Sequence, residues 1–271
     1  MKIVTWNINS IRLRMVLLKH LVSVHNPDVI LLQETKVSDD LFPYNALHEI
    51  GYRYLYYQGQ KSYNGVAILS KLPIDASFSI KLYNDDKRHV AVKIADLEIH
   101  NFYIPAGGDI PDINENPKFK HKLEYVQLIQ EWFKANRDQE SKIILAGDLN
   151  IAPLEHDVWS SKQLSKVVSH TDIERAALIN LQNSLGLIDS ARYFVPVHEK
   201  FYTWWSYRSI DWQKSNRGRR LDHIWVSNNL QNRLIAIEAV VDARNWQRPS
   251  DHVPYIVQIA DEYEGGGTVV I

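Results

Sequence analysis

The sequence predicts an α+β fold in which two packed mixed sheets lie between outer helices, a four-layer αββα sandwich. Apolar strand-like runs recur along most of the 271 residues, and helical patterns stand between only some of them. Many strands with few helices are typical of two sheets that bury each other's inner faces. No linker or internal repeat divides the chain, so we expect one domain over residues 1–260 and a flexible, glycine-containing tail over residues 261–271.

The first 34 residues predict a βαβ unit. Residues 2–8 and 28–34 are apolar runs typical of buried strands, and residues 12–24 between them have helical periodicity. Strand, helix and strand in this order form a βαβ unit with parallel strands. The apolar face expected for the helix consists of Leu13, Leu17, Leu21 and Val24.

The rest of the chain adds two helices and a series of strands. Residues 118–134 and 171–185 have helical periodicity, and the second helix opens with a capping box from Thr171 to Glu174. Residues 105–117 are rich in turn residues and predict a long loop, which is usually functional or mobile. The remaining predicted strands are residues 52–57, 65–70, 89–94, 97–104, 142–146, 201–206, 221–226 and 255–259.

The composition excludes several classes of protein. The chain has no cysteine, which removes disulfides and thiol nucleophiles, so that oxygen or imidazole must hold any metal. The formal net charge of −1 excludes a globally basic nucleic-acid binder but not a local basic face. No apolar run approaches the ~18 residues of a membrane helix, and the N-terminus lacks a signal-peptide core. We therefore expect a cytoplasmic protein with no membrane association.

Polar side chains gather where four apolar runs begin or end. Asn, Glu, Asp and His supply amides, carboxylates and an imidazole, which together suit a hard cation and a phosphate. Ligand sites in layered α/β structures form at strand ends. The residues concerned are Asn7, Asn9, Glu34, Asp148, Asn150, Asp251 and His252.

Each of these residues also has a purely structural interpretation. Asp148 could be a helix cap or turn residue, Glu34 the exposed end of a strand, and Asn7 a local backbone partner. Taken singly, the structural interpretation is the stronger one for each residue. Four apolar strands with polar termini are harder to explain as four unrelated caps, so the sequence favours a shared site.

Six motifs in order resemble the exonuclease III family of AP endonucleases, part of the endonuclease/exonuclease/phosphatase superfamily. They extend over nearly the whole chain, which makes the resemblance much more specific than Gly-Asp-Leu-Asn alone. The resemblance implies a four-layer sandwich with its site where the two sheets meet at one edge. The motifs are Trp6-Asn7-Ile8-Asn9, Leu32-Gln33-Glu34-Thr35-Lys36, Gly65-Val66-Ala67-Ile68-Leu69, Gly147-Asp148-Leu149-Asn150, Arg220-Leu221-Asp222 and Ser250-Asp251-His252.

The resemblance implies a role for each matching residue. Glu34 is expected to ligate Mg²⁺, or Mn²⁺ in its place, with Asn7 and Asp251 nearby. Asp148 and Asn150 match the pair that activates the water and orients the phosphate, and they stand close to the metal. The other implied catalytic residues are His252 on the phosphate, its carboxylate partner Asp222, and the phenol of Tyr103. Asn9 stands where some family members have an acid, so one principal metal site is expected.

The chemistry supports these residue types independently of the family. Phosphodiester hydrolysis requires neutralised non-bridging oxygens, a deprotonated water and a stabilised leaving alkoxide. Mg²⁺ needs few protein carboxylates because it keeps waters and a substrate oxygen. Asp148 can accept the proton of the water, and Asp222 can hold His252 in one tautomer. The sequence leaves the identity of the general base open.

An aromatic and basic tract over residues 200–220 predicts contact with DNA. Aromatic rings interleaved with arginines suit a DNA backbone and an exposed base stack. A strand with alternate aromatic residues in the core and a solvated basic turn would explain some of the same residues. Family members insert an aromatic residue from this region near a flipped abasic sugar, and Trp204 matches it by position. The expected DNA-binding residues are Lys36, Trp204, Arg217, Arg219 and Arg220.

These observations predict a monomeric Mg²⁺-dependent DNA repair nuclease. Its expected substrate is double-stranded DNA with abasic sites or blocked 3′ ends, cut 5′ to the abasic site or trimmed by 3′–5′ exonuclease activity. One alternative is a phosphoesterase for lipid or inositol phosphates, against which the aromatic and basic tract argues. The other is a catalytically silent nucleic-acid-binding regulator, which should have lost site residues that this chain retains.

Overall fold

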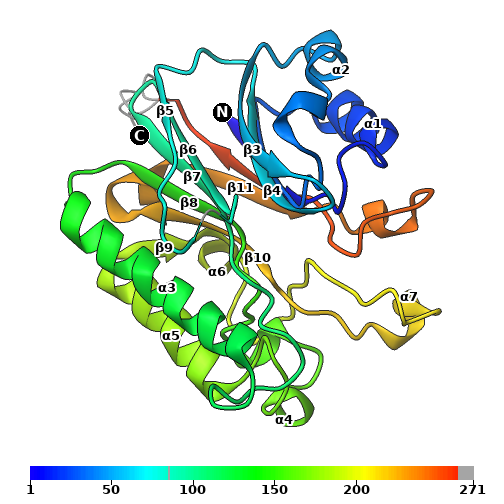
Figure 1. Cartoon of the computed structure of the whole chain (residues 1–271), viewed down its shortest axis with the longest axis vertical. Helices are drawn as coiled ribbons and strands as arrows, with labels where there is room; N and C mark the ends of the chain where they lie inside the picture. The colour runs from blue at the N-terminus through cyan, green and yellow to red at the C-terminus, as the bar shows by residue number, and fades with distance from the viewer. Residues whose placement is uncertain (85, 262–271) are drawn as a thin grey trace, which may run out of the picture.

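Two six-stranded sheets pack face to face and helices cover their outer sides, in a computed structural model that describes residues 1–84 and 86–261 (Figure 1). This is the predicted four-layer α/β sandwich. Most of the predicted strands are present with both ends within two residues of the predicted ends. Within the described residues, no helix is both long and apolar enough to span a membrane.

The first sheet contains the predicted βαβ unit. Its strand order is β11-β12-β1-β2-β4-β3. Strands β1 and β2 are parallel and are joined through helix α1, Met15–His25, while the other pairs are antiparallel. The strands are β1 Lys2–Asn7, β2 Val29–Gln33, β3 Tyr54–Gln60, β4 Tyr63–Ser70, β11 Leu234–Ala239 and β12 Tyr255–Ile259.

The second sheet has the order β5-β6-β7-β8-β10-β9. Only β7 and β8 are parallel, and helix α3, Pro117–Asn136, lies between them in the chain. Each sheet therefore contains one parallel pair, β1/β2 or β7/β8. The carboxyl ends of two parallel strands lie at the same edge of their sheet. The strands are β5 Ala76–Phe78, β6 His89–Ile94, β7 Leu97–Tyr103, β8 Ile143–Asp148, β9 Leu187–Asp189 and β10 Asp222–Ser227.

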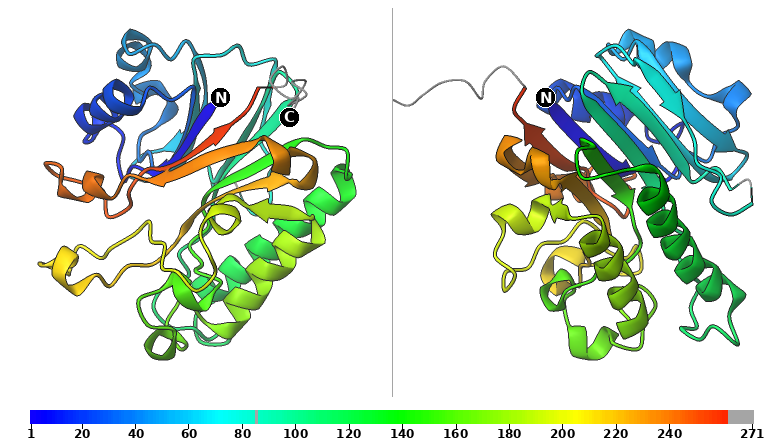
Figure 2. Two further views of the ribbon diagram at one scale, coloured as in Figure 1. Left: turned by 180° about the vertical axis from the view of Figure 1, so that it is seen from behind. Right: turned by 90° about the vertical axis from the view of Figure 1, so that its left-hand side faces the viewer.

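The helices form the two outer layers (Figure 2). Helix α1 and the short α2, Tyr44–Glu49, lie outside the first sheet, whereas α3 and α5, Asp172–Ser184, run side by side outside the second. The predicted capping box of α5 is present, because Thr171 and Glu174 each bond the backbone of the other. The remaining short helices are α4 Ser161–Leu164, α6 Ser190–Phe194 and α7 Trp212–Ser215, with 3₁₀ turns at Asp39–Leu41, Glu155–Asp157, Asn228–Arg233 and Val241–Asn245.

The core divides into three layers of apolar side chains. The central one fills the space between the sheets with β-branched residues such as Ile3, Val92 and Ile144, which are fully buried. One outer layer packs β1, β2 and β4 against α1, and the other packs β7 and β8 against α3 and α5. Apolar side chains therefore pack on the inner and outer faces of both sheets.

Two sequence predictions about individual elements are wrong. Residues 201–206 do not form a regular strand: Trp204 makes only single-residue bridges, to Arg219 and to His252. Trp204 lies between the segments that precede β10 and β12 and bridges one residue of each. The expected face of the first helix is also wrong, because Leu13 is 52% and Val24 59% exposed.

The structure gives this helix a different apolar face, and it describes only the start of the predicted tail. Helix α1 begins at Met15 and buries Leu17, Leu18 and Leu21, so its apolar face is rotated from the one expected. The flexible tail was predicted for residues 261–271, and all of it except Asp261 lies outside the described residues. Its flexibility therefore stays a prediction.

Candidate active site

The ends of five strands meet at one edge of the sandwich. In the first sheet Asn7 at the end of β1 pairs with Gln33 at the end of β2, directly before Glu34. In the second sheet Asp148 at the end of β8 pairs with both Tyr103 of β7 and Asp222 of β10. The sheets face each other, so residues from distant parts of the chain converge on one spot.

Glu34 lies at the centre of the first group of polar side chains. Its Oε1 accepts hydrogen bonds from Asn7 Nδ2 at 2.9 Å and from the Tyr103 hydroxyl at 2.7 Å. Its Oε2 pairs with Lys36 Nζ at 2.7 Å. Burial pushes the pKa of Glu34 upward, but the bonds from Asn7 and Lys36 outweigh it and the pKa is lowered. Glu34 is therefore a carboxylate at neutral pH.

The phenol of Tyr103 keeps its proton. Burial and the adjacent carboxylate of Glu34 hold the pKa of Tyr103 well above its usual value. The hydroxyl accordingly acts as a hydrogen-bond donor in this structure, directed at the same carboxylate oxygen that Asn7 contacts.

Asp148 connects the two halves of the site. Its Oδ2 accepts from Asn7 Nδ2 at 2.9 Å and lies 3.7 Å from His252 Nε2. Asn150 donates its backbone N–H to Asp148 Oδ1 at 3.0 Å and its side-chain amide to Ile104 O at 2.9 Å. Burial raises the pKa of Asp148, against the opposing effect of the His252 charge. A carboxylate whose basicity is raised in this way is suited to accept a proton from water.

Asp222 and His252 form the predicted pair. Asp222 Oδ2 lies 2.8 Å from His252 Nδ1, and both side chains are buried. Burial alone would lower the pKa of His252, but the carboxylates of Asp222 and Asp148 more than offset it and the pKa is raised. The ring is therefore an imidazolium that donates Nδ1–H to Asp222 and presents Nε2–H to the site.

Asp251 lies beside the same group of polar side chains and contacts Trp204 of the aromatic and basic tract. Its Oδ2 accepts from Trp204 Nε1 at 3.0 Å, and its Oδ1 lies 3.4 Å from Asn9 Nδ2. The serine before it fastens this segment to β1, because Ser250 Oγ donates to Asn7 O at 2.7 Å. The segment that carries Asp251 and His252 is thus tied to the strand that carries Asn7.

The donor set fits a metal ion. Glu34, Asp148 and Asp251 offer carboxylate oxygens and Asn7 and Asn150 offer amides, which are the ligands of hard divalent cations. A cation already lies against these oxygens, because the ammonium of Lys36 is 2.7 Å from both Glu34 Oε2 and Asn9 Oδ1. A second group of possible ligand atoms, from Asp148, Asp222 and His252, lies within 4.8 Å of one another. There the 2.8 Å bond between Asp222 and His252 favours a proton rather than a metal between them.

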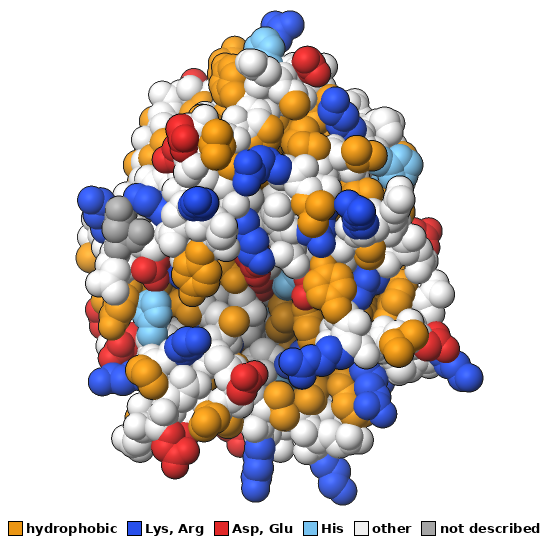
Figure 3. All heavy atoms as spheres, turned by 45° about the vertical axis from the view of Figure 1, so that its right-hand side comes forward, with side chains coloured by type: hydrophobic (Ala, Val, Ile, Leu, Met, Phe, Trp, Pro, Cys, Tyr) orange, Lys and Arg blue, Asp and Glu red, His pale blue; other side chains and the backbone are white. Residues whose placement is uncertain are grey.

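A cleft of about 930 Å³ opens above these residues. Figure 3 shows a hollowed face on which acidic and histidine side chains lie deep among apolar, lysine and arginine side chains. The aromatic and basic tract contributes to its wall: the Arg219 guanidinium lies over the Trp204 ring at 5.2 Å, and that of Arg217 over Trp159 at 4.7 Å. The cleft therefore has a floor of carboxylate, amide and imidazole groups and a cationic, aromatic wall.

One predicted DNA-binding residue is placed wrongly by sequence reasoning. Arg220 is fully buried and pairs with Asp157 at 2.8 Å and with Asp189 at 2.6 Å. A guanidinium enclosed by two carboxylates has no face left for a phosphate, so Arg220 is a structural residue. Side chains alternate along the chain here, and the preceding Arg219 is the one that faces the cleft.

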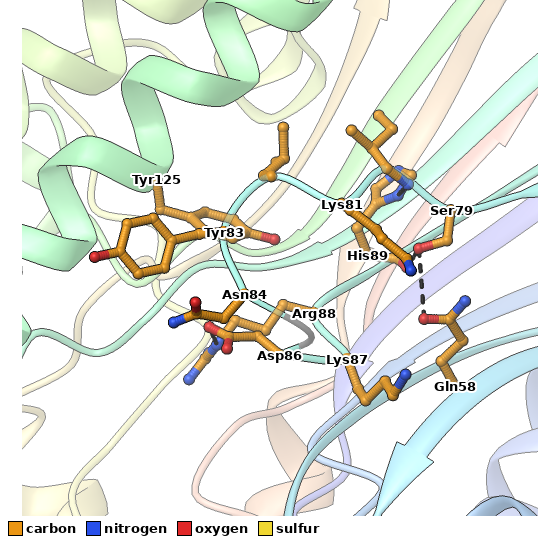
Figure 4. Close-up of a pocket in the computed structure, with 12 residues that line it drawn as sticks. Gln58, Ser79, Lys81, Tyr83, Asn84, Asp86, Lys87, Arg88, His89 and Tyr125 are labelled. Carbon is orange, nitrogen blue, oxygen red and sulfur yellow. Dashed lines mark hydrogen bonds and ion pairs between the residues drawn. The ribbon is translucent and has the colours of Figure 1, made fainter.

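Sequence reasoning missed two buried cations that touch site residues. Arg88 Nη1 donates to Tyr103 O at 3.3 Å, and its guanidinium lies over the Tyr103 ring at 4.7 Å. Arg88 also lines a small hollow of about 20 Å³ beside the loop before β6, where Figure 4 shows it next to Asp86. The other cation is Lys122, whose ammonium donates to Asn150 O at 2.8 Å. Neither stands in a recognisable motif, so no local signal could have identified them.

Carboxylates, amides and an Asp–His pair that meet at one edge of the sandwich suit the metal-dependent hydrolysis of phosphoesters. The profile of the Endonuclease/Exonuclease/phosphatase family matches residues 4–252, and the chain belongs to this family. It is 33% identical over 268 residues to exodeoxyribonuclease III of Haemophilus influenzae. The aligned region covers 94% of this chain and 98% of the relative.

Solved structures agree with this assignment. An AP endonuclease from Archaeoglobus fulgidus superposes with a TM-score of 0.90 at 32% identity, covering 96% of this chain and all of that one. A 3′–5′ exonuclease from Neisseria meningitidis does so with a TM-score of 0.89 at 33% identity and the same coverage. The fold and the family expected from the sequence motifs are thereby confirmed.

Proposed function

We propose that this chain is a Mg²⁺-dependent DNA repair nuclease that cuts phosphodiesters 5′ to abasic sites and trims blocked or normal 3′ ends. The observation that carries the proposal is the convergence of Glu34, Asp148 and the Asp222–His252 pair on the floor of a cleft with a cationic, aromatic wall. The floor suits hydrolysis of a phosphodiester, and the wall suits the DNA that contains it.

The chain's own groups supply a base, hydrogen-bond donors to the phosphate, and orientation. Asp148 accepts the proton of the attacking water, since its pKa is raised by burial and its Oδ2 faces the site. His252 donates a hydrogen bond through Nε2 to a non-bridging phosphate oxygen, and its positive charge offsets the charge that develops there. Asp222 keeps that imidazolium in one orientation.

Tyr103 and Asn150 orient without adding negative charge. The Tyr103 hydroxyl is held protonated beside Glu34 and remains a donor to oxygens in the site. Asn150 is fixed against Asp148 and Ile104, so it can orient the water or phosphate without repelling it. Glu34, Asn7 and Asp251, with Asp148 and Asn150 nearby, would hold Mg²⁺, or Mn²⁺ in its place. When bound, this ion neutralises charge on the phosphate and its leaving oxygen.

The wall of the cleft supports DNA as the substrate. Arg217 and Arg219 provide positive charge at its side, and Trp204 provides a ring beside Asp251 for an unstacked base or sugar. Lys36 faces the same floor from the first sheet. Among similar structures, a Neisseria 3′ phosphatase at 33% identity is described as bound to product DNA hairpin. A lipid or inositol phosphate would make no use of this aromatic wall.

The test is a cleavage assay on a duplex with one abasic site and on a matched duplex with a 3′ phosphate. We expect incision 5′ to the abasic site and release of the 3′ phosphate in Mg²⁺, and neither in chelator. DNA binding without cleavage in Mg²⁺ or Mn²⁺ would instead support a silent regulator. Hydrolysis of inositol phosphates but not of DNA would support the other alternative.

The monomeric state and the cytoplasmic location expected from the sequence stay predictions.

A further inference from the structure

An ion pair lies completely buried beneath the cleft. Lys122 of α3 and Glu174 of α5 are both 0% exposed, and Lys122 Nζ lies 2.5 Å from Glu174 Oε1. Removing two charges from water is costly, and apolar side chains often stabilise a core at least as well as such a pair. A buried pair at this position therefore calls for a role that apolar side chains could not fill.

Lys122 uses all three of its N–H donors, two of them on the lining of the cleft. Besides Glu174, its ammonium donates to Asn150 O at 2.8 Å and to Ala106 O at 3.1 Å. Asn150 follows Asp148 at the end of β8, and Ala106 follows β7 in the loop whose Gly108 and Asp109 line the same cleft. One ammonium thus joins the backbone of two neighbouring walls.

Glu174 extends the connection to a third wall. Both of its carboxylate oxygens accept from Ser169 N at 2.9 Å, and Oε2 also accepts from Thr171 Oγ1 at 2.7 Å. Ser169 Oγ in turn accepts from Arg219 Nη1 at 2.7 Å, and Arg219 lies over the ring of Trp204. The predicted capping box of α5 is therefore also the anchor of the arginine that faces the cleft.

Both backbone segments that Lys122 contacts include a residue in the left-handed region. Asn150 has φ = 53°, a conformation that asparagine adopts more readily than most non-glycine residues. The loop beyond Ala106 packs on the lysine stem as well: a Cβ on Gly107, where φ is 91°, would lie 2.8 Å from Lys122 Cδ. The aliphatic stem and the ammonium of Lys122 together position this turn and the backbone of Asn150.

From these contacts we propose that Lys122 and Glu174 are a positioning pair for catalysis, which places Asn150 and the 105–108 turn relative to Asp148. The inference rests on the proposed nuclease function. Neither residue touches substrate, and each acts through the backbone groups it holds. Loss of the pair's charges should therefore slow the chemical step while leaving DNA affinity nearly unchanged, because Arg217 of the wall is exposed and touches neither residue.

The test uses Lys122→Met combined with Glu174→Gln, which removes both charges while keeping the side-chain stems. In single-turnover cleavage of an abasic duplex at saturating Mg²⁺ we expect a 10- to 100-fold slower rate, with the Kd for DNA within threefold of the parent. The matched control is Arg137→Met with Glu98→Gln, another ion pair, at 2.5 Å, which touches no site residue and should leave the rate unchanged.

A double-mutant cycle separates positioning from general stability. In an Asn150→Ala background the Lys122/Glu174 change should slow cleavage less than threefold, because the side-chain amide that the pair positions is already absent. Equal losses in both backgrounds, or a folded variant with the full parental rate, would overturn the proposal. If the variant does not fold, Gly107→Ala presses on the lysine stem from an outer loop and should show the same dependence on Asn150, with a smaller loss. Failure of the parent to cleave DNA would refute the proposed function instead.

Discussion

The imidazole of His252 depends on one neighbour for both its charge and its tautomer. Asp222 accepts from Nδ1 at 2.8 Å, and its carboxylate contributes most to raising the pKa of His252 against burial. Loss of that charge should therefore lower the pKa of His252. A substitution that keeps the shape of Asp222 but removes its charge isolates this effect.

Asp222→Asn should therefore reduce single-turnover cleavage on the order of 10²–10³-fold, or roughly 3–4 kcal/mol of transition-state stabilisation, while DNA binding persists. The corresponding change in the serine-protease triad costs about 10⁴, an upper bound because here the ring need not move a proton in both steps. Combined with His252→Ala, the loss should fall well short of the product of the two single losses. Simple multiplication would give Asp222 a role separate from His252.

Glu34 sits at a strand end, outside the packed interior of the sheets. Its side chain contacts Asn7, Tyr103 and Lys36, all polar partners at the site. Glu34→Ala should abolish Mg²⁺-dependent cleavage and leave circular dichroism unchanged. Glu34→Gln, which can keep the hydrogen bonds from Asn7 and Tyr103 but loses the charge and the ion pair with Lys36, should also be inactive. Full activity of either variant at low Mg²⁺ would remove Glu34 from the metal site.

The loop that carries α7 is the clearest element for contact with DNA. It stands apart from the sandwich in Figure 1, and Arg208 and Arg217 line the cleft from its two sides. Its tip is unusually exposed, with Ile210 in full contact with solvent. Because Arg220 is enclosed by carboxylates, the charge that can reach phosphates comes from this loop and from Arg219.

Arg208→Gln with Arg217→Gln should weaken DNA binding equally for all sequences. If each arginine makes one phosphate contact, the slope of log K against log salt should flatten by about 2, since each contact contributes about 0.9. Lys134→Gln, on an exposed position of α3, is the control for the change in net charge and should not alter the slope. An unchanged slope in the double variant would mean that the loop faces away from DNA.

The molecule as a whole owes part of its stability to buried charge networks around β10. Asp157 is fully buried between Arg220 and Arg192, at 2.8 and 2.5 Å. Burial pushes the pKa of Asp157 upward, but the two guanidinium groups lower it from 3.8 to about 2. Since the folded pKa lies below the unfolded one, this carboxylate stabilises the fold above about pH 4, and the contribution is lost as the pH falls towards 2.

Urea unfolding between pH 7 and pH 2.5 should reveal this contribution, on the order of 2 kcal/mol at neutral pH. Asp157→Asn should be much less stable than the parent at pH 7, and the gap should narrow as the pH approaches 2. Asp242→Asn, which removes an exposed carboxylate, is the control and should follow the parent curve. A gap that stayed constant with pH would show that Asp157 acts through hydrogen bonds alone.

The sequence by itself determined the sandwich, nine of its twelve described strands and the polar strand ends, but not β5, β9 or β11. These are local or periodic features: apolar runs bounded by turns, a capping box at Thr171, and motifs such as Gly147-Asp148-Leu149-Asn150. These features can be recognised without the tertiary structure, because hydrophobic periodicity and strand ends depend on residues that are close in the sequence. They were enough to identify the site residues as candidates and the family as a whole.

Only the tertiary structure decided which side of each element is buried and which charges meet. It showed that Arg219 faces the cleft while Arg220 pairs with Asp157, 63 residues away. It also showed that Trp204 bridges the segments before β10 and β12, and that Lys122 and Glu174 meet beneath Asn150. Burial and ion pairing depend on contacts between residues far apart in the chain, and no local pattern records which of two adjacent arginines will find a buried carboxylate.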